Sequence, residues 1–182
     1  MTLLTLPHPV SHVYEAAALD RRLKDVPDAP GVYAFYADDL PEALVPFAPA
    51  SAGPTTLYVG QTGDRLNLRI EHHLFRDARV STLRGSLGLL VQDALGLELV
   101  RLPGTRQFCF TDEQPLTDWL RHHTRVAFAV SEHPSQTEAA WLAIEPGLLN
   151  IKGCPPTPLT AEIREMRRFA SGRHLRLPAA PR

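Results

Sequence analysis

Two short apolar segments, each carrying a tyrosine, constrain the fold of this chain more than any other feature. Residues 31–37 read GVYAFYA and follow Pro30, and residues 55–60 read TTLYVG and follow Pro54. Val, Tyr and Phe favour strands, and a proline commonly precedes one. The stretch 60–63, with a glycine at each end, is typical of a turn. We therefore predict two strands that each carry a tyrosine.

An amphipathic helix is predicted directly after this turn, over residues 65–76. Its apolar side chains recur at helical spacing, at Leu66, Ile70 and Leu74. Its basic side chains form a second stripe, made of Arg65, Arg69, His73 and Arg76. The unit to be explained is therefore two tyrosine-bearing strands followed by a helix with one basic face.

Composition limits the class of protein. A chain of 182 residues with 44% apolar content suits one domain with terminal additions. The formal charge of -1 excludes a uniformly basic surface. Cys109 and Cys154 have no metal-ligand spacing, which argues against a disulfide framework and favours a reducing, cytoplasmic location. The start of the chain, MTLLTLPHPV, lacks the pattern of a signal peptide, and no run of about eighteen apolar residues occurs, so we predict no membrane association.

Hydrophobic periodicity predicts the remaining elements. Helices are expected over residues 12–25, 81–95 and 111–123, around Glu138, and after an N-cap at Thr160, and a third core strand over residues 125–131. Gly85 and Gly88 either allow another element to approach the second of these helices closely or weaken it. The 24 residues between Tyr33 and Tyr58 are rich in Pro and Ala and predict a surface loop.

An ordered set of motifs connects the chain to a known family. The set consists of GVY at 31–33, YVG at 58–60, Arg69 eleven positions after Tyr58, Glu138 on a helix, and Asn150 shortly past it. On these residues the chain resembles the GIY-YIG nucleases over about residues 31–152. The resemblance implies an α+β fold, with a small mixed or antiparallel three-stranded sheet flanked by helices and extra helices inserted and at the termini. It divides the chain into an N-terminal helical extension (1–29), a nuclease domain (30–153), and a Pro-rich connector with a basic C-terminal helix or arm (154–182).

The resemblance also implies a metal-dependent endonuclease that cuts DNA phosphodiester bonds. Glu138 would hold a single Mg²⁺, or Mn²⁺, because Mg²⁺ takes one or two carboxylates and keeps several waters. Tyr33 would be the general base, although a free phenol is only about one part in a thousand ionised at pH 7. Arg69 would lower the pKa of that phenol and neutralise charge in the transition state.

Supporting roles fall to residues near these groups. Tyr58 would orient the attacking water or a phosphate oxygen, and His73, one helical turn after Arg69, would relay a proton. Asn150 would hold the site together by hydrogen bonds. Nucleic-acid contacts are expected from Gln61, Arg65 and Arg76, with Gln61 standing where many relatives carry a lysine. DNA is the expected partner, RNA is an alternative, and a homodimer or larger complex is possible because one site nicks one strand.

Each residue also has a purely structural interpretation. Tyr33 and Tyr58 are the kind of half-buried aromatic residue that strands commonly carry, and Glu138 follows Ser135 at capping-box spacing. The histidine pairs at 72–73 and 122–123 point apart on helices, which argues against zinc. Two other functions therefore stay open: a catalytically inactive nucleic-acid-binding module that uses the basic helix and C-terminal arm, and a structural adaptor.

Overall fold

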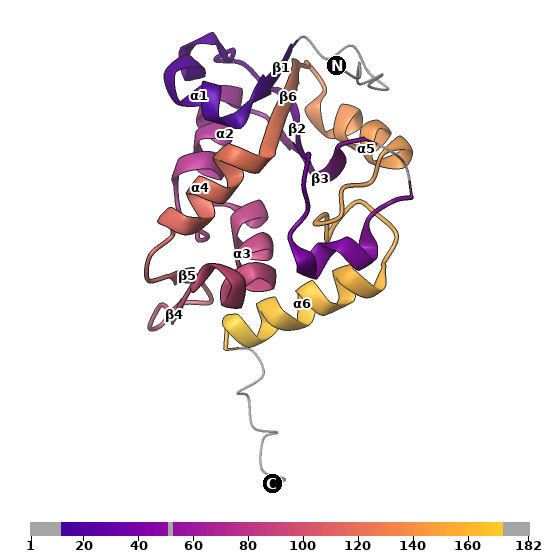
Figure 1. Ribbon diagram of the computed structural model, residues 1–182. Helices are drawn as coiled ribbons and strands as arrows, with labels where there is room; N and C mark the ends of the chain where they lie inside the picture. The colour runs from indigo at the N-terminus through magenta and orange to yellow at the C-terminus, as the bar shows by residue number, and fades with distance from the viewer. Residues whose placement is uncertain (1–11, 51–52, 173–182) are drawn as a thin grey trace, which may run out of the picture.

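The computed structural model describes residues 12–50 and 53–172, which form a mixed α+β domain (Figure 1). The elements in chain order are β1 His12–Glu15, α1 Ala16–Arg22, the 3-10 turn η1 Leu23–Asp25, β2 Gly31–Ala37, the 3-10 segment η2 Glu42–Phe47, β3 Thr55–Thr62, α2 Leu66–Phe75, α3 Thr82–Leu95, β4 Leu99–Arg101, β5 Phe108–Phe110, α4 Gln114–His123, β6 Thr124–Val130, α5 Pro134–Ile144 and α6 Pro158–Ala170. A four-stranded antiparallel sheet has the order β1-β6-β2-β3, and β4 and β5 form a separate hairpin. The predicted class, an antiparallel sheet flanked by helices, is confirmed.

Strand β2 lies at the centre of the molecule because both of its faces are apolar. All seven of its residues are buried. The side chains at 33, 35 and 37 join the larger core, and those at 32, 34 and 36 join a smaller core with Trp141 and Leu142 of α5. The first tyrosine motif is therefore held from both sides, and its neighbour across the sheet is Gly60 of the second motif.

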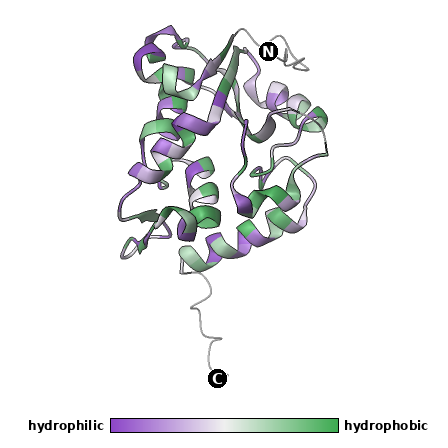
Figure 2. Ribbon diagram, viewed as in Figure 1, coloured by the Kyte–Doolittle hydropathy of each residue, from purple (hydrophilic) through white to green (hydrophobic). Residues whose placement is uncertain are grey.

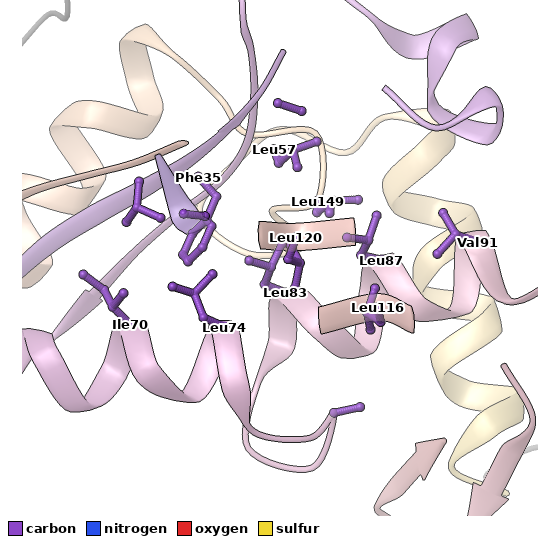
Figure 3. Packing of buried hydrophobic residues seen from close by; sticks show 14 of the residues in the cluster. Phe35, Leu57, Ile70, Leu74, Leu83, Leu87, Val91, Leu116, Leu120 and Leu149 are labelled. Atoms are coloured by element: carbon purple, nitrogen blue, oxygen red, sulfur yellow. The ribbon is translucent and has the colours of Figure 1, made fainter. Parts of the chain in front are cut away.

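The larger core fills the space between the sheet and helices α2, α3 and α4. Figure 3 shows Ile70 and Leu74 of α2 close to Phe35 of β2, with leucines from α3 and α4 gathered beyond them. Each large apolar side chain that is fully buried contributes about 1.5–3 kcal/mol relative to an exposed one. The apolar stripe predicted for residues 65–76 is thus the surface that seats α2 on the sheet.

The N-terminal prediction is partly wrong. A helix was expected over residues 12–25, but residues 12–15 form β1, which pairs with β6, and only 16–22 are α-helical. Tyr14 stacks on Phe128 with ring centroids 5.6 Å apart. The aromatic and β-branched residues at this position pair with the open edge of β6, so the three-stranded sheet of the prediction has a fourth strand.

Helix ends follow local signals, with one shift. Ser81 caps α3 by accepting from the Arg84 backbone N–H, and Gly96 ends it in the left-handed conformation (φ 64°). The cap of α6 is Thr157 rather than the predicted Thr160; the two threonines form a reciprocal capping box after which Pro158 begins the helix. Figure 2 shows hydrophilic and hydrophobic residues alternating along α6, the pattern of a helix with one face on the core.

Two smaller observations complete the fold. The long connection between the tyrosines is not wholly a surface loop, since its segment η2 buries Leu44. Within residues 12–50 and 53–172, no helix combines the length and apolar character needed to cross a membrane.

Candidate active site

The hydroxyl of Tyr33 lies at the centre of a buried hydrogen-bonded cluster. It is 2.7 Å from Nε2 of His73, and Arg69 donates to it from Nε at 3.2 Å. Arg69 and His73 are one turn apart on α2, so both reach the same phenol. Gly60 provides the space, because a Cβ there would lie 2.5 Å from the Tyr33 hydroxyl. The glycine of the second motif is thus a steric requirement of the tyrosine of the first.

Burial dominates the ionisation of this cluster. It raises the pKa of Tyr33 well above that of a free phenol, and Tyr58 adds to the rise while Arg69 only partly opposes it. Burial, followed by the charge of Arg69, holds the pKa of His73 well below its usual value, so the imidazole is neutral. Arg69 does lower the pKa of Tyr33, as expected, but desolvation by burial is the larger effect, so the net pKa of Tyr33 is raised in the free protein.

Ser81 extends the cluster and was not predicted. Its Oγ lies 2.7 Å from Nδ1 of His73 and accepts the backbone N–H of Arg84 at 3.1 Å. Arg69 Nε–H donates to the Tyr33 oxygen, which suits a Tyr33 proton directed at Nε2 of His73 and an imidazole proton on Nδ1 facing Ser81. Only the helix-capping role of Ser81 has a signal in the sequence; its contact with His73 is a tertiary one.

A cavity of about 310 Å³ adjoins this cluster. Tyr58 faces it from β3, and Glu138 from α5. Its other lining residues are Thr82, Leu142, Asn150, Ile151, Lys152, Gly153 and Arg167. Tyr33, Arg69 and His73 do not line it; Tyr58 links the two groups, with ring centroids 6.4 Å from Tyr33 and 5.6 Å from His73.

Lys152 and Arg167 bring positive charge to the cavity that the motifs did not predict. Arg167 comes from α6, far along the chain from the first tyrosine. The sequence marks the C-terminal region as basic, but which of its arginines turns toward the site depends on the packing of α6 on α3. The charge of Arg167 lowers the pKa of Tyr58, although burial raises it by more.

Glu138 is the carboxylate of the cavity. It is half-buried, and burial raises its pKa. The capping-box interpretation is wrong, because α5 begins after His133 and no side chain caps it. Within the described ranges no group of three or more His, Cys, Asp and Glu side chains is arranged for a metal. One desolvated carboxylate beside open cavity space fits a hard cation that retains most of its waters, as Mg²⁺ does.

Asn150 fastens the loop after α5 to strand β3. Its Oδ1 accepts the Val59 backbone N–H at 2.8 Å, and its Nδ2 donates to the Val59 carbonyl at 2.7 Å. Gly147 permits the approach, since a Cβ there would lie 2.9 Å from the Tyr58 Cα. Asn150 therefore holds the Tyr58 strand against the loop that carries Lys152.

The residues predicted to contact nucleic acid lie away from the cavity. Arg65 is within 3.7 Å of Asp28 and 3.9 Å of Asp64, and Arg76 forms an ion pair with Glu71 at 2.8 Å. Gln61 is on β3 and is partly buried. Carboxylates thus already accompany the two arginines of this surface.

Fold and site together describe a small α+β domain in which a buried tyrosine, arginine and histidine cluster lies beside a cavity. The family model described as GIY-YIG catalytic domain matches residues 31–169, most of the chain. The protein therefore belongs to the GIY-YIG family, and a nuclease-type function follows for the domain in general terms. No curated protein and no solved structure gives a significant match. The family match ends at residue 169, within α6, and therefore reaches farther along the chain than the motif resemblance, which covers about residues 31–152.

Proposed function

We propose that this protein is a metal-dependent endonuclease that hydrolyses phosphodiester bonds of DNA in the cavity between β3, α5 and α6. One observation carries the proposal: Tyr58, Glu138 and Arg167 line a single cavity beside the Tyr33–Arg69–His73 cluster. An anionic group, two cations and a chain of proton-transfer groups are the parts that hydrolysis of a phosphodiester requires.

Binding of the scissile phosphate is assigned to Lys152 and Arg167. Both side chains line the cavity, and a guanidinium suits phosphate because it donates two parallel hydrogen bonds. Arg69 adds a fixed positive charge beside Tyr33 that opposes the negative charge of the transition state.

Proton transfer is assigned to Tyr33 and His73, with Tyr58 orienting the water. As the water oxygen bonds to phosphorus and the bond to the leaving oxygen breaks, the water proton passes to the Tyr33 oxygen and the Tyr33 proton to Nε2 of His73. The leaving oxygen keeps the electron pair of the broken bond and takes up a proton from the solvent. Burial favours the neutral imidazole from which this transfer starts, and it disfavours the imidazolium that the transfer produces, so the proton must pass on from His73. This role requires bound substrate to admit water to the Tyr33 hydroxyl, which is fully buried in the free protein.

Glu138 would hold the metal, with Mg²⁺ or Mn²⁺ as the candidates. The ion would supply positive charge to the phosphate oxygens when bound. Because burial raises the pKa of Glu138, the carboxylate gains from a cation that replaces its lost hydration.

The test is nicking of supercoiled plasmid DNA by the pure protein with Mg²⁺ or Mn²⁺. Glu138→Gln removes the charge at nearly constant shape, and we expect it to cut at least about 100-fold more slowly because a metal contributes several kcal/mol to such reactions. Glu132→Gln is the matched control, since Glu132 is exposed and lies just before α5. Equal cutting by wild type and Glu138→Gln would contradict the metal role.

An inactive nucleic-acid-binding module is the second candidate. The raised pKa values of Tyr33 and Tyr58 favour this alternative, because a phenol that seldom ionises seldom provides the phenolate that would accept a proton. Salt-dependent DNA binding in EDTA, with no nicking under any Mg²⁺ or Mn²⁺ condition, would establish this alternative and exclude the endonuclease.

A further inference from the structure

A second cavity lies next to the one that holds Glu138, on the side of α6. It has a volume of about 290 Å³ and is lined by Arg106, Phe108, Ile151, Arg164, Arg167, Arg168 and Ser171. Arg106 lies between β4 and β5, whereas Arg164, Arg167 and Arg168 lie on α6. Two of the lining residues, Ile151 and Arg167, also line the first cavity, so the two cavities adjoin there.

The charge of this cavity is one-sided. Four of its lining side chains are guanidinium groups, and no carboxylate is among those lining residues. Arg168 pairs with Glu165 on the outside of α6, and Arg164 donates to the Ile151 carbonyl at 2.6 Å. Each of these contacts involves one nitrogen of a guanidinium group that carries five N–H donors. Like charges gathered around a hollow repel one another, and an anion with several acceptor oxygens relieves that repulsion.

Arg167 is held in place at the junction of the two cavities. Its guanidinium lies over the Phe108 ring, 5.5 Å from the centroid, and contacts the Thr82 carbonyl and the Ser86 hydroxyl at 3.5 and 3.4 Å. Gly85 leaves room for it, since a Cβ at that position would lie 2.7 Å from Nη1 of Arg167. A guanidinium braced in this way is pre-organised for recognition of a planar or tetrahedral anion.

Comparison with the surface predicted from the sequence strengthens the case. Arg65 and Arg76 each lie beside a carboxylate, as Arg168 does beside Glu165, but only the cavity near α6 gathers four arginines around a hollow that no carboxylate lines. Nucleic-acid backbones present one phosphate per nucleotide, so a strand with one phosphate in the first cavity carries others at regular intervals beyond it. The adjoining basic cavity lies where such a phosphate can be bound.

We propose that the cavity formed by Arg106, Arg164, Arg167 and Arg168 binds a backbone phosphate of the same strand whose scissile phosphate occupies the neighbouring cavity. The proposal rests on the nuclease function proposed above. It assigns the path of the strand to the α6 side of the molecule, and it makes α6 a sequence-independent anchor, because phosphate contacts position a nucleic acid without reading its bases.

Binding of a labelled duplex oligonucleotide to the full chain in EDTA tests this site without cleavage. The variant Arg164→Gln/Arg168→Gln removes two exposed guanidinium groups, so the fold is retained, and circular dichroism checks that. We expect affinity to fall about tenfold at moderate salt, and the slope of log affinity against log salt to decrease by about 0.9 for one lost phosphate contact.

The matched control is Arg21→Gln/Arg22→Gln on α1, which removes the same charge from the opposite end of the molecule (Figure 1). Its affinity and salt slope should equal those of wild type. Equal weakening by both double variants, or no weakening by either, would overturn the proposal. Plasmid nicking by wild type separates this proposal from the proposed nuclease function. If wild type cuts DNA and Arg164→Gln/Arg168→Gln binds DNA as well as wild type does, only the phosphate site near α6 is overturned. If the double variant binds DNA more weakly but wild type does not cut, only the nuclease function is overturned.

Discussion

At the scale of single residues, Tyr33, His73 and Ser81 form a buried chain of hydrogen bonds. Arg69 donates to the Tyr33 hydroxyl, which lies 2.7 Å from Nε2 of His73, and Nδ1 of His73 lies 2.7 Å from the Ser81 hydroxyl. His73 was predicted from its spacing after Arg69. Its complete burial, which keeps it neutral, could not be predicted from the sequence because it depends on how α2 packs on β2 and α3.

This burial makes stability depend on pH. The folded pKa of His73 is well below 6.5, whereas the unfolded value is near 6.5, so the unfolded chain binds the extra proton as the pH falls. Its contribution to stability is present above about pH 6.5 and decreases below it by about 1.4 kcal/mol per pH unit until the folded pKa is reached. Urea unfolding of wild type and His73→Gln between about pH 7.5 and 5 measures this contribution of His73 to the free energy of unfolding.

Other titrating groups contribute to both proteins and cancel in the difference. We therefore expect the wild type to lose more free energy of unfolding than His73→Gln on acidification. Parallel pH profiles for the two proteins would mean that His73 takes up a proton as easily in the folded state as in the unfolded one.

At the scale of elements, two glycines of α3 allow β5 and α6 to pack closely against this helix. Gly88 faces Phe110 of β5, and Gly85 faces Arg167 of α6. The sequence left two readings open for these glycines, close approach or a weakened helix, and close approach is confirmed. The choice between them needed the partners, which come from distant parts of the chain.

The two glycines should respond differently to alanine. In Gly88→Ala the new Cβ would lie 2.4 Å from the Phe110 ring, which is buried and cannot move aside, so we expect a loss of about 1–3 kcal/mol. In Gly85→Ala the nearest atom is the terminal Nη1 of the long Arg167 side chain, which can shift at the expense of its contacts at 3.4 and 3.5 Å, and the gain in helix propensity of up to about 1 kcal/mol prevails. Denaturant unfolding should rank Gly88→Ala below Gly85→Ala by at least about 1 kcal/mol.

Gly85→Ala also displaces the Arg167 guanidinium, so it should bind DNA more weakly while remaining at least as stable as wild type. The opposite ranking in stability, with Gly85→Ala the less stable protein, would show that the Arg167 side chain cannot shift to admit a Cβ at position 85.

At the scale of the whole molecule, the cavity exists only because β3, α5, the loop after α5 and α6 meet. A metal bound there by Glu138 would stabilise the folded chain by mass action. At a metal concentration tenfold above the dissociation constant, the gain is about 1.4 kcal/mol, which corresponds to a rise in Tm of roughly 3–6 °C for a domain of this size.

Thermal unfolding with and without Mg²⁺ or Mn²⁺ measures this gain. We expect the rise in wild type and in Glu132→Gln, and no rise in Glu138→Gln. Because burial raises the pKa of Glu138, the rise should also diminish at acidic pH, where the proton competes with the metal. A rise of equal size in Glu138→Gln would place the metal elsewhere.

The sequence by itself determined the class of fold, the two tyrosine strands, the presence of most helices and the ordered set that marks the family, because strand composition and helical periodicity act over a few residues. Tertiary structure alone decided that β1 pairs with β6, that Tyr33 is sealed between Arg69 and His73, and that Arg167 of α6 reaches the cavity of Glu138. These contacts join segments far apart in the chain, and their partners are selected by the packing of whole faces, which no local pattern encodes.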